Sequence, residues 1–155
     1  MTTPDLALPL DVERLLPHRP PMRLVDRLVE ATLGPDCLLA DVAGGLEPVA
    51  LIELIAQAYA AVRGYEERSQ GRPVQVGFLV GVSTITFPDL PGFRLTASTR
   101  LEIRVRTVGM FAGFALAEGE VRAGDRCLAA GGIKVWVPVD EEGGTADRPA
   151  SLGGR

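Results

Sequence analysis

The feature that most constrains the fold is the segment over residues 49–67, which reads VALIELIAQAYAAVRGYEE. It is rich in Ala, Leu and Ile and therefore predicts a helix, and Pro48 suits the first helical position. Through Val62 the helix is apolar on nearly every side. Such a helix must be buried all round, and in a small domain only a curved sheet is large enough to cover it.

The other apolar segments have the character of β-strands bounded by Gly, Pro and Asp. Two are predicted before the helix, over residues 22–33 and 37–42, and a short helix over residues 11–16, capped by Asp11, precedes them. Four strands are predicted after the helix, over residues 74–87, 93–108, 110–121 and 126–137.

Charged and apolar residues alternate strictly from Arg100 to Arg106, which is typical of a strand with one core face and one solvent face. We therefore place Arg100, Arg104 and Arg106 on the solvent face. The order of strands, one helix and more strands favours an α+β fold with a curved antiparallel sheet around one long central helix. We expect a single domain over residues 1–139 and a flexible, acidic, Gly-rich tail over residues 140–155.

Composition excludes several classes of function. With 16 Lys and Arg against 20 Asp and Glu, the net charge of -4 offers no attraction to nucleic acid or to an anionic membrane. The two cysteines, Cys37 and Cys127, lack metal-ligand spacing, so we expect no metal site and a reducing compartment. The N-terminus does not resemble a signal peptide, and no apolar run is long enough to span a bilayer. We expect a soluble, cytoplasmic protein.

Glu53 is the one acid in the apolar part of the helix, where carboxylates are rarely tolerated unless they are paired or used. Its interaction with the helix N-terminus would contribute at most about 1 kcal/mol, too little to explain burial. Gln57 follows four residues later on the same face, so the two side chains can hydrogen bond and line one pocket. We therefore interpret Glu53 as a functional acid.

His18 is the only histidine of the chain. It lies between prolines ahead of a predicted strand, where its ring can stabilise a turn, and we favour this structural role over a catalytic one. No serine or cysteine stands in a nucleophile motif. Gly77 and Gly81 are too weak a pattern to indicate phosphate binding and more often allow a strand to bend.

Three phrases together resemble the hotdog-fold dehydratases of 3-hydroxyacyl thioesters carried on acyl carrier protein. They are LLPHRPPMRLVDRLVE (residues 15–30), LIELIAQAYAA (residues 51–61) and GFLVGVSTITFPDLPGFRL (residues 77–95). Within that superfamily, the PPMRLVDR and GFLVG phrases are most similar to the dehydratase-like proteins of aryl-polyene biosynthesis clusters.

The resemblance implies a hotdog-fold dimer, joined edge to edge, with active sites at the interface. A histidine of one subunit takes the C2 proton while an acid on the other subunit's helix helps the 3-hydroxyl to leave. Glu53 matches that acid and Gln57 the glutamine one turn later. Val49 would offer its N–H to the thioester carbonyl. Gly77 and Phe78 would line the substrate site. The substrate would be a phosphopantetheine thioester of acyl carrier protein or coenzyme A, without a further cofactor.

The chain departs from that family at its catalytic loop. Residues 42–49 read VAGGLEPV and contain no histidine, and Pro48 has no N–H to donate. Three functions follow as hypotheses. The first, which we favour, is a dehydratase subunit that supplies Glu53 while a partner supplies the histidine. The second is an acyl thioesterase in which Glu53 activates water. The third is a non-catalytic acyl-binding or scaffolding subunit.

Overall fold

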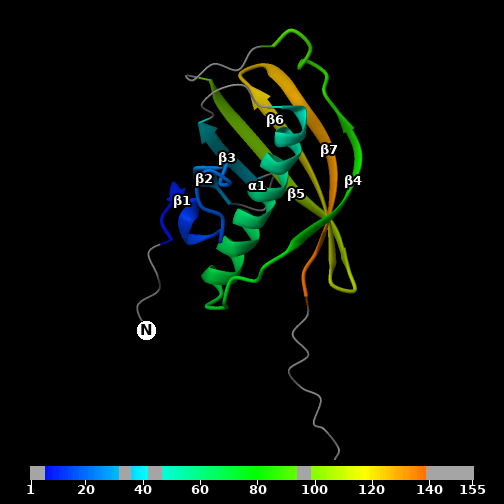
Figure 1. Cartoon of the computed structure of the whole chain (residues 1–155). Helices are drawn as coiled ribbons and strands as arrows, with labels where there is room; N and C mark the ends of the chain where they lie inside the picture. Colours follow the sequence, from blue (N-terminus) through cyan, green and yellow to red (C-terminus); the bar gives the residue numbers. More distant parts are fainter. Residues whose placement is uncertain (1–5, 32–35, 42–46, 94–98, 139–155) are drawn as a thin grey trace, which may run out of the picture.

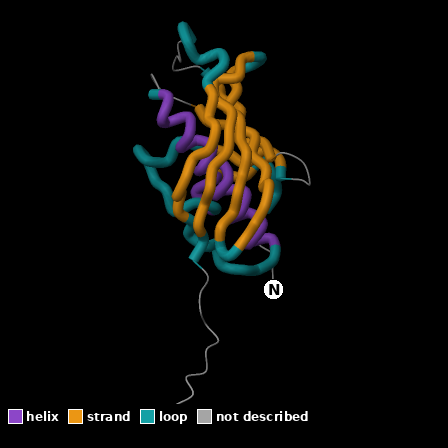
Figure 2. Tube along the Cα trace, turned by 90° about the vertical axis from the view of Figure 1, so that its right-hand side faces the viewer, coloured by secondary structure: helices purple, strands orange, loops and turns teal. Residues whose placement is uncertain are grey.

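The computed structural model describes residues 6–31, 36–41, 47–93 and 99–138. One long helix, α1 (Pro48–Ser69), lies against one face of an antiparallel sheet, as Figure 1 and the side view in Figure 2 show. Within these residues the sheet has seven strands, in the order β1-β2-β3-β5-β6-β7-β4. In chain order they are β1 (Leu10–Asp11), β2 (Arg27–Glu30), β3 (Asp36–Asp41), β4 (Phe78–Thr86), β5 (Arg100–Phe111), β6 (Phe114–Ala123) and β7 (Arg126–Trp136).

The core lies between α1 and the long strands β5, β6 and β7. The alternation in β5 is as predicted, because Leu101, Ile103 and Val105 are buried and face the helix. Close approach of helix and sheet depends on Gly119 in β6, where an added Cβ would lie 2.5 Å from Ile55 Cγ2. The small residue at this position therefore sets the depth at which α1 sits in the sheet.

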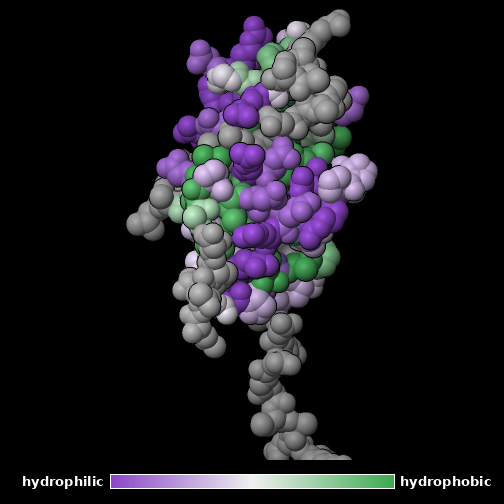
Figure 3. Space-filling model, turned by 90° about the vertical axis from the view of Figure 1, so that its left-hand side faces the viewer, coloured by the Kyte–Doolittle hydropathy of each residue, from purple (hydrophilic) through white to green (hydrophobic). Residues whose placement is uncertain are grey.

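The helix is not buried on all sides, so this part of the prediction is wrong. Val49 is 70 % exposed, and Ile52, Ala56 and Ala60 are only half-buried. The sheet covers one side of α1, and the chain around Leu15 covers another. The two approach so closely that a Cβ added to Gly64 would lie 2.5 Å from the Leu15 carbonyl oxygen. Figure 3 views the side of the molecule on which this N-terminal segment lies, where most side chains are hydrophilic. A third side of the helix remains open.

Strand β4 forms one edge of the sheet and pairs only with β7 among the described strands. Its apolar side chains are unusually exposed, at 51 % for Phe78, 52 % for Val80 and 48 % for Val82. An apolar edge with unpaired backbone groups is a surface on which another strand can pair. The open side of α1 and this open edge are two incompletely covered parts of the described chain.

Several predicted boundaries differ from those observed. Within the described residues 22–31, the predicted strand is regular only at β2, because the backbone before it forms hydrogen bonds with the Gln57 side chain of the helix. The turn predicted at Gly109 falls at Ala112 and Gly113, while the pairing of β5 and β6 is irregular between Thr107 and Gly109. The predicted short helix is a 3-10 turn over Val12–Arg14, and Asp11 caps it as expected.

The predicted tail over residues 140–155 and the histidine-free segment over residues 42–46 lie outside the described residues. None of the described helices is both long enough and apolar enough to cross a membrane.

Candidate functional site

Glu53 and Gln57 form the centre of the candidate site, one helical turn apart on α1. The Gln57 Nε2 donates a hydrogen bond of 2.9 Å to Glu53 Oε1, as the i, i+4 spacing predicts. Glu53 is half-buried, whereas Gln57 is only 1 % exposed. The carboxyl group therefore has one oxygen held by a buried amide.

The Gln57 amide is itself fixed by the segment that precedes β2. Its Nε2 also donates to the Met22 carbonyl oxygen at 2.8 Å, and its Oε1 accepts from the Leu24 N–H at 2.8 Å. These bonds use both the donor and the acceptor end of the amide, so its orientation is determined. Gln57 thus ties α1 to the N-terminal segment and at the same time positions Glu53.

A groove of about 230 Å³ runs along this side of the helix. Ala56 and Ala60 lie along it on α1, and Gly77, Phe78 and other residues at the start of β4 contribute to its lining. The space near Gly77 depends on the absence of a side chain, because a Cβ there would lie 2.9 Å from Val135 Cγ1. The volume is below the 300 Å³ or more that is typical of a complete small-molecule site.

The groove brings together most of the residues singled out in the sequence. Glu53, Gln57, Gly77 and Phe78 all line it. His18 lines it too, although we had predicted a structural role for this residue in a turn. Val49, at the start of the helix, is not among the lining residues and is largely exposed.

The start of α1 lacks a side-chain cap, since Glu47 at the N-cap position makes no such hydrogen bond. Pro48 occupies the first turn and has no N–H, as its residue type dictates. The Val49 N–H is among the first-turn groups that have no acceptor within a helix. An anionic or carbonyl oxygen placed at this end would meet a favourable helix dipole.

The end of the groove away from Glu53 is charged. Arg63 and Glu67 line it, and the Arg63 Nη2 donates to Glu67 Oε1 at 3.4 Å. The Arg72 Nε also donates to Glu67, and this hydrogen bond lowers the pKa of the buried Glu67 carboxyl against the opposing effect of burial. Glu67 is therefore stabilised as a carboxylate and is not a proton donor near neutral pH.

Sequence reasoning missed the far part of this site. Ala60 and Glu67 stand seven and fourteen residues after Glu53, which places them on the same side of a helix, and this spacing could have indicated a groove along α1. Tyr59, Gln75 and Val137 also line the groove. No spacing signal relates Gln75 or Val137 to Glu53, because the fold alone brings these elements together.

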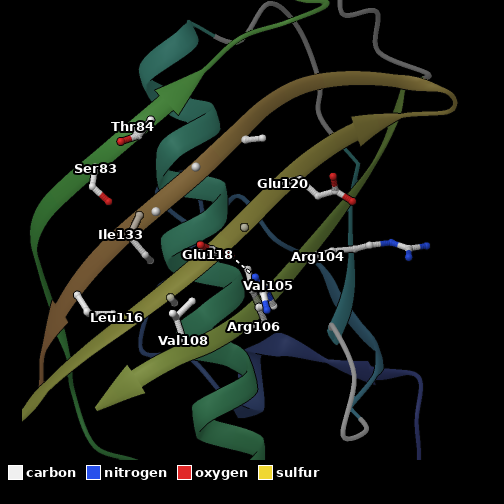
Figure 4. Close-up of a pocket in the computed structure, with 15 residues that line it drawn as sticks. Ser83, Thr84, Arg104, Val105, Arg106, Val108, Leu116, Glu118, Glu120 and Ile133 are labelled. Atoms are coloured by element: carbon white, nitrogen blue, oxygen red, sulfur yellow. Dashed lines mark hydrogen bonds and ion pairs between the residues drawn. The ribbon is translucent and has the colours of Figure 1, made fainter. Parts of the chain in front are cut away.

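A second hollow, of about 640 Å³, lies on the face of the sheet away from the helix (Figure 4). Arg106 of β5 and Glu118 of β6 form an ion pair at its floor, and Ser83 lines it from β4. None of the predicted site residues belongs to this hollow. The exposure of Arg104 and Arg106 confirms the predicted solvent face of β5.

A curved antiparallel sheet around one long helix is the defining architecture of the hotdog fold, and the chain is a hotdog domain with a carboxylic acid positioned in a groove beside its helix. The model of the ApeP-like family, described as ApeP dehydratase, matches residues 10–145. The chain therefore belongs to the ApeP-like dehydratase family, as the resemblance of its motifs predicted.

Curated relatives are also dehydratases. The chain is 32 % identical over 136 residues to the 3-hydroxyacyl-(acyl-carrier-protein) dehydratase FabZ of Magnetococcus marinus, covering 78 % of this chain and 88 % of the relative. It is 32 % identical over 124 residues to the FabZ dehydratase of Deinococcus radiodurans, covering 73 % of this chain and 86 % of the relative. The chain is thus a dehydratase-like hotdog subunit.

Solved structures agree on the fold. The dehydratase heterocomplex ApeI:P from Xenorhabdus doucetiae matches with a TM-score of 0.74 and 22 % identity, covering 84 % of this chain and 93 % of that chain. A hypothetical thioesterase from Streptococcus pneumoniae, solved with coenzyme A, matches with a TM-score of 0.53 and 14 % identity over 72 % of this chain and 84 % of that one. Both identities are below 25 %, so both likenesses extend to the fold only.

Proposed function

We propose that this chain is one subunit of a heteromeric dehydratase that removes water from a 3-hydroxyacyl thioester of acyl carrier protein. Glu53 acts as the acid for the leaving hydroxyl, and a related hotdog subunit supplies the histidine that this chain lacks. The observation that carries the proposal is the hydrogen bond from the buried Gln57 amide to Glu53, which holds one carboxyl oxygen of an acid that lines the groove.

The proposed reaction is an elimination in which atoms balance without a cofactor. The partner's histidine takes the proton from C2, the electron pair of that C–H bond forms the C2–C3 double bond, and the C3–O bond breaks. Glu53 gives its proton to the departing hydroxyl, which leaves as water. The product is the 2-enoyl thioester. The site returns to its starting state when the histidine releases its proton to solvent and Glu53 takes one up from solvent.

The start of α1 suits the thioester carbonyl, because negative charge develops on that oxygen as C2 loses its proton. The Val49 N–H and the helix dipole would stabilise this charge. Pro48 contributes no N–H, so a donor from elsewhere in the complex would complete this part of the site. Gly77 and Phe78 would bind the acyl chain along the groove.

A partner subunit is supported by what the domain leaves open. The groove has a smaller volume than a complete site, the helix side that bears Glu53 and Ala56 is only partly covered, and the adjacent β4 edge exposes Phe78 and Val80. A second sheet that pairs with β4 would cover all three. The ApeI:P protein is by its description a heterocomplex, which is the arrangement that we propose here.

Two other functions remain as outcomes of the test. A thioesterase would use Glu53 to activate water, and a non-catalytic subunit would bind the acyl group without using Glu53. The family and the curated relatives favour dehydration over hydrolysis.

The test is to purify the chain alone and with its co-purifying hotdog partner, and to supply a 3-hydroxyacyl thioester of acyl carrier protein. The complex should form the 2-enoyl product, the single chain should not, and Glu53→Gln in the complex should reduce the rate by a hundredfold or more. Glu102→Gln, which changes a paired acid on β5 outside the groove, should leave the rate unchanged.

Full dehydratase activity of the pure chain would disprove the need for a partner. Hydrolysis in place of dehydration, abolished by Glu53→Gln, would establish the thioesterase. Unchanged dehydration in the Glu53→Gln complex would assign this chain to the non-catalytic class.

A further inference from the structure

Tyr59 lies on α1 and lines the groove that contains Glu53. Tyr59 is 2 % exposed, and its hydroxyl is buried without a hydrogen-bond partner among the described residues. The sequence shows nothing unusual at this position, since a tyrosine ring suits a helix core. The unusual feature is a buried phenolic hydroxyl that bonds to nothing in the described chain.

Such groups are few in the described part of the chain, and two of them belong to residues that line the groove. Four enclosed side-chain nitrogen or oxygen atoms lack a hydrogen-bond partner there. Two belong to Arg23, whose guanidinium is instead ion-paired with Glu13 at 2.8 Å. The remaining two are Tyr59 Oη and His18 Nδ1, and both residues line the groove.

An unpartnered buried hydroxyl destabilises the folded chain, because the group loses its hydrogen bonds to water and gains none. Phenylalanine would retain the ring and its packing without this cost. The hydroxyl of Tyr59 therefore lowers the stability of the free chain, and a hydrogen bond with another molecule would remove this cost.

We propose that Tyr59 is a substrate-binding residue whose hydroxyl forms a hydrogen bond with an oxygen atom of the bound acyl group. The inference rests on the proposed function and adds a recognition group for the substrate. It makes Tyr59 a determinant of which acyl groups the site accepts, since an acyl group without an oxygen at this place leaves the hydroxyl unpaired.

The thioester carbonyl oxygen is placed above at the start of α1, so two other oxygen positions of the acyl group are open to Tyr59. Tyr59 stands six residues after Glu53, which corresponds to about 9 Å along the helix axis. Helical side chains lean toward the helix N-terminus, which shortens the distance along the axis between the Tyr59 hydroxyl and Glu53, and both residues line the same groove. The partner is therefore either the 3-hydroxyl or an oxygen farther along the acyl chain.

The test compares the chain with its Tyr59→Phe variant, each in complex with the hotdog partner. Dissociation constants are measured for three thioesters, namely a 3-hydroxyacyl chain, the same chain without the 3-hydroxyl, and a 3-hydroxyacyl chain with a terminal hydroxyl. The variant should bind at least one oxygen-bearing thioester about 2- to 12-fold more weakly, the effect of one hydrogen bond. Loss with both 3-hydroxyacyl thioesters assigns the 3-hydroxyl, and loss with the terminal hydroxyl alone assigns the distal oxygen.

A second readout concerns stability. Without ligand, Tyr59→Phe should unfold at a higher temperature than the unmodified chain. The matched control is Tyr65→Phe on the same helix, which lies outside the groove and whose hydroxyl donates to the Leu6 carbonyl at 3.4 Å. This control should be no more stable than the unmodified chain and should bind each of the three thioesters as tightly as the unmodified chain does.

The proposal would be overturned if Tyr59→Phe bound each of the three thioesters as tightly as the unmodified chain does. So would a lower unfolding temperature of the free variant, or a loss confined to association with the partner, because either would assign the hydroxyl to a protein contact. Binding is measured separately from turnover, so failure of the dehydratase proposal, seen with Glu53→Gln, is distinguishable from failure of this one.

Discussion

Gln57 and Glu53 are joined by a hydrogen bond of 2.9 Å between the Gln57 Nε2 and the Glu53 Oε1. Gln57 in turn is bonded to two backbone groups of the N-terminal segment, at Met22 and Leu24. One side chain therefore performs a structural and a positioning role. The consequence is that the stability of the domain and the geometry of its acid depend on the same amide.

Gln57→Leu is expected to reduce both properties. It removes the hydrogen-bond partner of the part-buried Leu24 N–H and Met22 carbonyl, at about 1–2 kcal/mol each, and it frees the Glu53 side chain to adopt other rotamers. We expect the free energy of unfolding to fall by about 2–4 kcal/mol, measured by urea denaturation, and kcat/KM of the complex to fall at least tenfold.

The control for this variant is Gln70→Leu, which changes an exposed glutamine at the end of the same helix. Its effect on unfolding should stay within about 0.5 kcal/mol. A Gln57→Leu variant as stable and as active as the unmodified complex would show that neither role belongs to this side chain.

The sequence predicted the parts of the fold that local patterns determine. The helix expected over residues 49–67 is Pro48–Ser69, and the alternation from Arg100 to Arg106 places the core face of β5 correctly. The pair of Glu53 and Gln57 was predicted for the same reason, because i, i+4 neighbours meet on any helix. Periodicity acts over a few residues, and these features need nothing more.

What the sequence could not show depends on contacts between distant segments. His18 enters the Glu53 groove because the chain before β2 packs on α1 at Leu15 and Met22. The open side of the helix was missed for a related reason. An apolar helix must be covered, but its composition does not distinguish cover by its own sheet from cover by another chain.

Glu67 and Arg72 make stability depend on pH in the acidic range. The hydrogen bond from Arg72 lowers the pKa of Glu67 below its ordinary value of 4.5, so the folded chain binds this proton less readily than the unfolded chain does. The stabilisation is present above pH 4.5 and is lost as the pH falls from that value through the lowered pKa. Glu67→Gln should therefore be less stable than the unmodified chain at pH 7, with a difference that shrinks below pH 4.5.

Urea denaturation at a series of pH values measures this difference. Glu118→Gln, which removes a paired acid on the outer sheet face, is the comparison for a surface ion pair and should show a much smaller change. A stability difference for Glu67→Gln that stays constant from pH 7 to pH 3 would contradict the assigned pKa shift.

His18 tests whether the missing base lies within this chain or in its partner. His18 and Glu53 line one groove, so a base and an acid are both present in a single subunit. If the partner supplies the base, His18→Asn in the complex should retain at least about a tenth of kcat, whereas loss of a general base costs a hundredfold or more. The rate of dehydration by the purified complex, measured across pH, distinguishes a base in the partner from a base in this chain. The catalytic base would instead be His18 if the His18→Asn complex folds but shows two changes. Its kcat would fall a hundredfold, and its pH profile would no longer show the rise in rate that comes from deprotonation of the base.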